Sequence, residues 1–488
     1  MAIMMMNIRV KPLNFPGRYW AYLALLIWGS SVFLILQKTP YGADEGGARA
    51  LLLVWSVADR VVTPVVTFGV PDFRAIFYIP VGILWTGNVL AARIFSILIT
   101  ALAIWIIYKW RDRAGENESA LLASGLFLIS PLIVNQIDTL AIVPFLLFCF
   151  ASGAWLDQRY RQEQPRLFGG LHFFQMFLCA VSTTLHPAGM AYPAVLAWSW
   201  YKNPPDQNQQ KYFLGGIALA TALALLLTLG WHDINWFTNP VVSLSNAIMG
   251  IPLTEENSLR GIRGAIGSGA LLILLLVVWR QFRELRKDFL GRILLVGLVL
   301  SLMAGDEAWS ALALSICLYW GLPLLMRSNI SGGFIKQRGM ALTTLFILSM
   351  AFTASDKARY QQLQGGFLSP SDALIKTLVE STDVSKHDTS NVAGGGAMRV
   401  ASQWPGRTML ACGCDALPLP PPVEDENILL TMMHGISYLM FDPKEAANGP
   451  LARDLAMLGG EKTETIAVRD AGVIIRIKDS PPARKKTP

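Results

Sequence analysis

Residues 18–37 read RYWAYLALLIWGSSVFLILQ, and residues 41–49, which read YGADEGGAR, follow after three residues. The first stretch is apolar over about 20 residues, enough for a helix to cross a bilayer core of roughly 30 Å. The second stretch places two adjacent carboxylates, Asp44 and Glu45, just beyond that helix. These charges are therefore expected at a membrane surface, and the rest of the chain decides which surface it is.

The composition is that of a membrane protein. Of the 488 residues, 53% are hydrophobic and only 15% are charged, whereas soluble domains carry roughly 25% charged residues. The net charge of +7 comes from Lys and Arg in short clusters between apolar runs, not from one basic face. Such clusters are topology signals, so we expect membrane lipids as partners and no nucleic acid.

Apolar windows predict an α-helical polytopic domain over residues 1–354, with about eleven transmembrane helices and a range of nine to thirteen. Several of the windows are shorter than 17 residues, notably 187–201 and 292–305, and are candidates for helices that do not cross fully. The expected spans are 18–37, 88–108, 119–134, 138–156, 168–186, 187–201, 212–230, 263–279, 292–305, 308–326 and 339–354.

The basic clusters orient these spans. Lys109, Arg111 and Arg113 form one of several clusters that fall on the same side when the N-terminus is cytoplasmic, as the positive-inside rule requires. This topology places the loop 38–87, with Asp44 and Glu45, on the outer side of an inner (plasma) membrane. Residues 48–62 of the loop read ARALLLVWSVADRVV, which is typical of an amphipathic helix lying in the membrane interface.

Beyond the last apolar run the composition becomes richer in Gly, Pro and charge, which predicts a small soluble α/β domain over 355–480 and a disordered basic tail over 481–488. By the same topology this domain is extracytoplasmic. Strands are expected at 407–412 and 436–441, a helix at 450–458, and a hairpin formed by 463–468 and 472–477. Cys412 and Cys414 are two residues apart, so any bridge between them closes a very tight ring.

Asp44 and Glu45 allow two interpretations. At a membrane surface two carboxylates can act as a general base and a positioning acceptor, or hold a divalent cation. Alternatively, Asp44 caps the helix that begins there, and Glu45 pairs with Arg49 at the i, i+4 spacing. Local sequence alone favours the second interpretation.

Other charged residues are candidates for binding a phosphate or positioning a substrate. Arg49, Arg74 and Arg93 can each hold a phosphate with two N–H donors. Arg93 lies inside an apolar run, where it needs a partner or must reach the headgroups. Asp138 stands at a short turn, where a helix cap and a site residue are equally open interpretations. His186 stands at a break between two apolar segments, where a structural role is the more common one.

The order of several motifs resembles the GT-C glycosyltransferases, in particular the protein O-mannosyltransferase (family 39) and lipid A aminoarabinose transferase group. Members of that group read approximately D-E-x-x-Y in the first loop and G-x-x-x-x-A-A-R-L-x-S at the second span. The corresponding stretches here are the Asp44-Glu45 loop, residues 87–96 (GNVLAARIFS), Ser130-Pro131-Leu132 with a downstream Asp138, and residues 185–189 (LHPAG), where His186 stands near the family lysine. The likeness covers roughly residues 15–200.

The resemblance implies a sugar donor linked to polyprenyl phosphate, and transfer on the outer face of the membrane with inversion at the anomeric carbon. It makes Asp44 the base, with the phosphate met by Arg74, Arg93 or a divalent cation; no other cofactor is expected. The acceptor is a lipid, a glycan or a protein. One family motif, E-K-P-P-L, is replaced here by residues 71–76 (PDFRAI), so that Asp72 and Arg74 stand in for its acid and base.

Two functions of other classes compete with a transferase. A transporter or flippase of a lipid-linked substrate would line a path with intramembrane charges and would show an internal repeat, which the sequence lacks. A non-catalytic envelope assembly protein would depend on residues 355–488 and not on Asp44.

Overall fold

The structure is a computed structural model of the full chain. It describes residues 17–36, 38–58, 72–113, 117–128, 130–163, 169–204, 207–228, 286–304, 308–321, 370–381, 398–423, 425–444, 448–458, 462–469 and 472–478. The predicted spans at 263–279 and 339–354, the boundary at 354/355 and the tail at 481–488 lie outside these residues.

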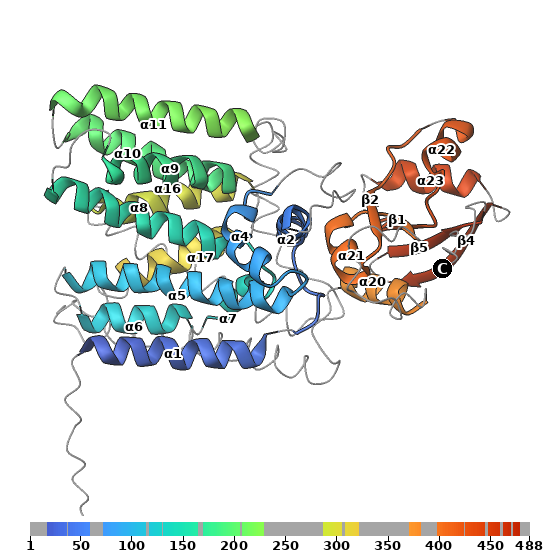
Figure 1. The fold of residues 1–488 in the computed structure, drawn as a ribbon, viewed down its shortest axis with the longest axis horizontal. Helices are drawn as coiled ribbons and strands as arrows, with labels where there is room; N and C mark the ends of the chain where they lie inside the picture. The colour runs from blue at the N-terminus through green and yellow to red at the C-terminus, as the bar shows by residue number, and fades with distance from the viewer. Residues whose placement is uncertain are drawn as a thin grey trace, which may run out of the picture.

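Long apolar helices lie side by side in a bundle, and a smaller α/β domain stands at one end of it (Figure 1). The bundle shares one apolar core cluster that runs through nearly all of its described helices. Its helices are α1 (Gly17–Ile35), α5 (Val89–Arg113), α6 (Asn117–Leu128), α7 (Pro131–Asp138), α8 (Val143–Glu163), α9 (Gly170–Leu185), the 3₁₀ turn η1 (Pro187–Met190), α10 (Ala191–Lys202), α11 (Gln207–Thr228), α16 (Phe289–Ala304) and α17 (Ala308–Ile316).

Every predicted span that falls within the described residues corresponds to a helix, but the count of eleven crossings is not confirmed. Only two described helices, at Val89–Arg111 and Gln209–Leu227, are both long and apolar enough to cross a membrane. The window 119–134 is divided into α6 and α7, because Pro131 cannot continue the helix that precedes it.

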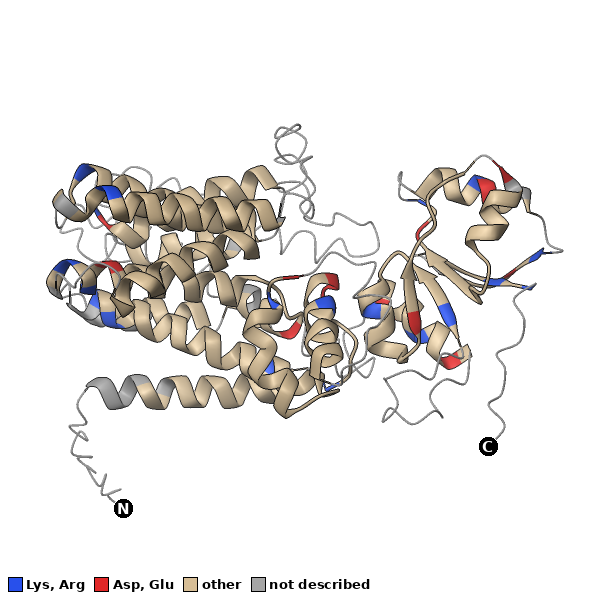
Figure 2. Ribbon diagram, turned by 45° about the horizontal axis from the view of Figure 1, so that its top comes forward, with Lys and Arg blue, Asp and Glu red and all other residues tan. Residues whose placement is uncertain are grey.

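The two ends of the bundle differ in charge. Most of its Lys and Arg residues gather at the end opposite the α/β domain (Figure 2), which we call the basic end. This end holds the last turns of α5, α8 and α10, with Lys109, Arg111, Arg159, Arg161 and Lys202. The opposite end, which we call the domain-facing end, carries the loop with Asp44 and Glu45. The separation follows the positive-inside pattern on which the predicted topology was based.

The first loop forms a helical pair at the domain-facing end. The predicted amphipathic helix is α2 (Glu45–Ala58), and it packs against α4 (Ala75–Leu84), a helix that the sequence did not predict. Gly82 permits this packing, because a Cβ atom there would collide with Val54. More than half of α2 is buried by α4 and by the α/β domain, so it is a packed element and not only an interfacial one.

The α/β domain contains a five-stranded sheet in the order β2-β1-β3-β5-β4. β1 (Arg399–Ser402) pairs in parallel with β2 (Asp415–Pro418) and with β3 (Tyr438–Phe441), while β5 (Gly472–Ile477) is antiparallel to β3 and to β4 (Thr463–Arg469). The predicted strand at 436–441 and the hairpin of 463–468 with 472–477 are confirmed as β3, β4 and β5.

Helices cover both faces of this sheet. α22 (Glu426–Met432) and α23 (Gly449–Met457), the latter predicted at 450–458, pack on one face. α20 (Pro370–Ser381) and α21 (Pro405–Cys412) pack on the other. Each face therefore has its own apolar core, as a three-layer α/β/α arrangement requires.

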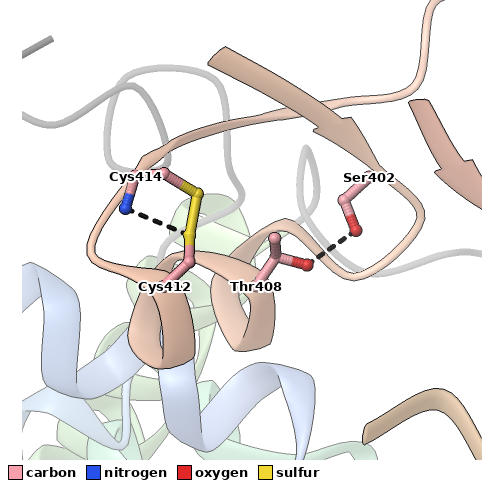
Figure 3. Close-up of a disulfide and its surroundings, with 4 residues drawn as sticks. All are labelled: Ser402, Thr408, Cys412 and Cys414. Carbon is pink, nitrogen blue, oxygen red and sulfur yellow. Dashed lines mark hydrogen bonds between the residues drawn. A yellow bond between two sulfur atoms is a disulfide. The ribbon is translucent and has the colours of Figure 1, made fainter. Parts of the chain in front are cut away.

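The prediction of a strand at 407–412 is wrong, because these residues belong to α21. The local signals are those of a helix: Pro405 stands in the first turn, and Gly413 ends the helix with a φ of 64°. Figure 3 shows the surroundings, in which Cys412 and Cys414 form a disulfide with a Cα–Cα distance of 5.2 Å. The hydroxyls of Ser402 and Thr408, 2.8 Å apart, join the end of β1 to α21.

Candidate active site

Three loops that are distant in sequence meet at the domain-facing end of the bundle. The first carries Asp44, the second carries Asp72 and Arg74, and the third follows α7 at residues 138–141. The backbone N–H of Asp44 donates to the Thr139 carbonyl at 2.7 Å, and Nη1 of Arg74 donates to the Leu140 carbonyl at 3.0 Å. The loops are thus joined by backbone groups as well as by charges.

Arg74 is the centre of this meeting point. Its Nη1 lies 2.7 Å from Oδ2 of Asp44, and its Nη2 lies 2.7 Å from Oδ2 of Asp72. Its Nε also donates to Oδ1 of Asp72 at 2.9 Å. One guanidinium therefore holds two carboxylates, and we call Asp44, Asp72 and Arg74 the domain-facing cluster. The Arg74 side chain is only 7% exposed, so in this arrangement it holds the acids and does not point its donors outward.

Asp44 is fixed but open on one side. Its Oδ1 accepts the backbone N–H of Gly47, which caps the first turn of α2, as the structural interpretation of the sequence predicted. Although Arg74 and the Gly47 N–H hold the Asp44 side chain in place, that side chain is 39% exposed. A carboxylate that is oriented by an arginine and a helix terminus, yet reachable, has the geometry of a positioned base.

The pKa values of Asp44 and Arg74 are both shifted by their surroundings, and each shift has its own cause. Burial in the loop region raises the pKa of Asp44, while the Arg74 guanidinium and the Gly47 N–H lower it in part. Burial lowers the pKa of Arg74, but Asp44 and Asp72 outweigh this effect, so that its pKa lies well above the ordinary value. Arg74 therefore remains a cation, and Asp44 is a stronger base than an ordinary surface aspartate.

The small residues of the first loop make the close approach possible. A Cβ atom on Gly46 would collide with the side chains of Arg74 and Asp72, and one on Gly47 would lie 2.7 Å from the Leu140 carbonyl oxygen. Leu140 itself has a φ of 58°, a strained value for a residue with a branched side chain. Backbone strain of this kind concentrates at functional sites, where the surrounding packing maintains it.

Glu45, next to Asp44, has different partners. Its Oε1 accepts from Nε of Arg49 at 2.7 Å, the predicted i, i+4 pair. At the start of α21, the backbone N–H of Gly406 also donates to Oε1 of Glu45, and that of Arg407 donates to Oε2. No sequence pattern indicates this contact, because it joins residues 361 positions apart. The two adjacent carboxylates thus face two different parts of the molecule.

Arg93 and Asp138 lie beneath the loops. The Arg93 side chain is fully buried and donates to the backbone carbonyls of Thr39, Tyr41 and Asp138 at 2.6–2.7 Å. Its Nε also lies 3.6 Å from the Asp138 carboxylate. The partner that the apolar surroundings demanded is therefore present, and Arg93 does not reach out to headgroups. These contacts hold the first loop on α5.

His186 lies in the break between α9 and η1, where its Nδ1 accepts the N–H of Ala188 at 3.1 Å and caps the turn. It belongs to a different pair of elements from the domain-facing cluster.

No group of three or more His, Cys, Asp or Glu side chains that could hold a metal is found among the described residues. Asp44 and Asp72 share the Arg74 guanidinium.

The similarity of this protein to known proteins lies in the fold. No protein-family model and no curated protein matches the sequence. Among solved structures, ArnT from Cupriavidus metallidurans in the apo state is similar at 12% identity and a TM-score of 0.52, over 94% of this chain and 98% of that one.

A second similar structure is the archaeal oligosaccharyltransferase AglB from Archaeoglobus fulgidus, solved in complex with an inhibitory peptide and a dolichol-phosphate. It shares 12% identity and a TM-score of 0.51, over 92% of this chain and 73% of that one. Both alignments include the bundle and the α/β domain, since each spans more than nine-tenths of the chain. The chain therefore shares the overall fold of these two structures.

Proposed function

We propose that this protein is an integral membrane glycosyltransferase that moves a sugar from a polyprenyl-phosphate donor to a lipid, glycan or protein acceptor, on the outer face of an inner membrane and with inversion. The observation that carries the proposal is Asp44, a part-exposed carboxylate oriented by Arg74 and by the first turn of α2. It stands at the end of a GT-C bundle that faces the α/β domain.

The chemistry assigned to this site is a single displacement. Asp44 accepts the proton of the acceptor group as that group bonds to the anomeric carbon. The bond from this carbon to the phosphate oxygen breaks, and its electron pair leaves with the polyprenyl phosphate. A base whose position is fixed before the reaction spares the reorganisation that a mobile side chain would need.

The departing phosphate needs a cation, and Arg49 is the best-placed candidate among the described residues. Its Nε is bound to Glu45, but its two Nη groups have no hydrogen-bond partner in the described part of the chain. Its side chain is 24% exposed and lies one turn along α2 from Glu45. Arg74 contributes indirectly by holding Asp44 and Asp72, and Arg93 by fixing the loop.

The test is donor cleavage by the purified protein in vesicles. A panel of radiolabelled polyprenyl-phosphate sugars is supplied, and released polyprenyl phosphate is measured for the wild type and for Asp44→Asn. Loss of the base should lower the release rate by about 10²-fold or more. Asp425→Asn is the matched control, because Asp425 also caps a helix, α22, through a backbone N–H at 2.8 Å.

The alternatives predict other results in the same vesicles. A flippase would move the labelled donor across the membrane without cleaving it. An assembly protein would cleave nothing and would be indifferent to Asp44→Asn. Wild-type release rates in Asp44→Asn would overturn the assignment of Asp44 as the base.

A further inference from the structure

The α/β domain has a topological switch point, the place where such folds usually bind ligands. From β1 the chain crosses through α21 to β2 on one side, and from β2 through α22 to β3 on the other side of β1. The connections that leave the neighbouring strands β1 and β3, through α21 and α23, cover opposite faces of the sheet. In sheets of this kind a crevice opens at the carboxyl ends of the strands, between β1 and β3, where a helix N-terminus attracts anions.

In this protein the anion at that position is Glu45. α21 begins three residues after the carboxyl end of β1. The backbone N–H of Gly406 donates to Oε1 of Glu45 at 2.7 Å, and that of Arg407 donates to Oε2 at 3.1 Å. Both carboxylate oxygens thus bind the first turn of α21, where the aligned peptide dipoles favour a negative charge.

The contact is a fitted joint and not a loose approach. A Cβ atom on Gly406 would lie 2.8 Å from Cγ of Arg49 and 2.9 Å from Oε1 of Glu45, so a larger residue there would displace these side chains. Met409 of α21 belongs to the apolar core cluster of the bundle. Tyr41 of the first loop packs in the reverse direction, against the core under α20 and α21.

Arg407 ties the joint to the rest of the α/β domain. Its Nη2 lies 2.7 Å from Oδ1 of Asp372 on α20, and both side chains are largely buried. Glu45 therefore binds a turn that is itself held rigidly. On the other side, Glu45 is the first residue of α2 and follows Asp44 directly, so a displacement of α21 would be passed to Asp44 through one peptide unit.

We infer that Glu45 is a positioning residue: its carboxylate binds the first turn of α21 at the switch point of the α/β domain, docks that domain on the first loop, and so fixes Asp44. The docking stands on geometry alone, while the effect on Asp44 rests on the proposed transferase function. This differs from the catalytic role that the sequence suggested for Glu45, because its two oxygens are directed at backbone donors and Arg49.

The docking is tested without reference to activity, by hydrogen exchange of the Gly406 and Arg407 amides in the full-length protein in nanodiscs. Glu45→Gln should raise exchange at these amides by about tenfold or more, because a charge-assisted acceptor is lost. Asp44→Asn and the exposed Glu464→Gln should leave it unchanged. Unchanged exchange in Glu45→Gln would overturn the docking, whatever the protein transfers.

The effect on Asp44 is tested by breaking the joint from its other side. Gly406→Ala and Glu45→Ala should each lower kcat for donor cleavage by about tenfold or more, the latter also because it removes the pair with Arg49. The double variant should be no worse than Glu45→Ala alone, since both changes remove the docking contact. The acid limb of the pH–rate profile should persist, because the base is retained. Additive losses, or loss of the acid limb in Glu45→Ala, would overturn the positioning role.

Discussion

Two arginine–carboxylate clusters stand at opposite ends of the same bundle, and their exposures are reversed. In the domain-facing cluster, Arg74 is 7% exposed and Asp44 is 39% exposed. At the basic end, Asp157 is 5% exposed and Arg161 is 29% exposed, with 2.8 Å between Nε and Oδ2. The first cluster presents an acid to its surroundings, and the second presents a cation.

The two clusters also differ in the elements that supply their residues. Arg161 and Asp157 are one turn apart on α8, and their other partners, Ser199, Trp200 and Asn203, belong to α10 and its end. The domain-facing cluster instead joins three loops and includes a strained backbone at Leu140. The basic-end pair is a local device that locks two helices together. The other cluster maintains a costly arrangement with a reachable carboxylate, which supports the role proposed for Asp44.

The largest difference between the two clusters is expected when each arginine is exchanged for lysine. Arg74→Lys keeps the charge but cannot reach Asp44, Asp72 and the Leu140 carbonyl together, because a lysine ammonium lacks the planar fork of donors. We expect the initial rate of donor cleavage to fall by about 10²-fold. Arg161→Lys should leave the rate per folded molecule unchanged. Equal losses in the two variants would mean that both clusters serve only stability.

A smaller effect is expected from the glycine that lets the loops meet. Gly47→Ala places a Cβ atom 2.7 Å from the Leu140 carbonyl and 2.8 Å from Oδ1 of Asp44. The loops must shift by a fraction of an ångström, and we expect the cleavage rate to fall by about tenfold. Gly215→Ala on α11 is the control, since no atom lies within 4 Å of its Cβ position. A rate in Gly47→Ala equal to that of the control would contradict the tight meeting of the loops.

Asp72 allows the electrostatics of the cluster to be tested with little change in geometry. A base works when it is deprotonated, so activity is lost as the pH falls through the pKa of Asp44, and burial places that acid limb above the ordinary carboxylate value of about 4. Asp72 contributes to the raised pKa by repulsion. Asp72→Asn should therefore move the acid limb of the pH–rate profile to lower pH, whereas a shift to higher pH would contradict the assignment of Asp44 as the titrating base.

Short-range features of both clusters could be predicted from the sequence. The cap by Asp44 and the pair of Glu45 with Arg49 follow from spacings of three and four residues, and both are confirmed. The partner of Arg93 could be predicted in kind, because a buried guanidinium must be satisfied. Its identity as three backbone carbonyls could not, since that depends on how the loops fold over α5.

The long-range features could not be predicted for the same physical reason. Asp44 binds Arg74 across 30 residues and Glu45 binds Gly406 across 361, and no periodicity encodes such distances. The helix α21 was mistaken for a strand because eight residues carry too weak a period, although Pro405 and Gly413 supplied its start and stop. Features set by residues close in sequence could be predicted, whereas contacts between residues distant in sequence could not.

The smallest effect on activity, and the largest on stability, is expected from the carboxylate of the basic end. Asp157→Asn removes the charge that pairs with Arg161 and weakens the bond from Nε1 of Trp200. Breaking a buried pair costs about 3–5 kcal/mol, and the partial exposure of Arg161 reduces this to about 1–3 kcal/mol. The melting temperature in detergent should therefore drop by several degrees, with the cleavage rate per folded molecule unchanged.

Asp44→Asn should behave in the opposite way, because asparagine is also a good helix cap and Arg74 keeps its pair with Asp72. Its melting temperature should stay near that of the wild type while its cleavage rate collapses. The same chemical substitution thus separates the two clusters along two axes, stability and rate. If Asp157→Asn lowered the rate and Asp44→Asn lowered the melting temperature, the reachable acid would be the structural one and the roles assigned to the two ends would be exchanged.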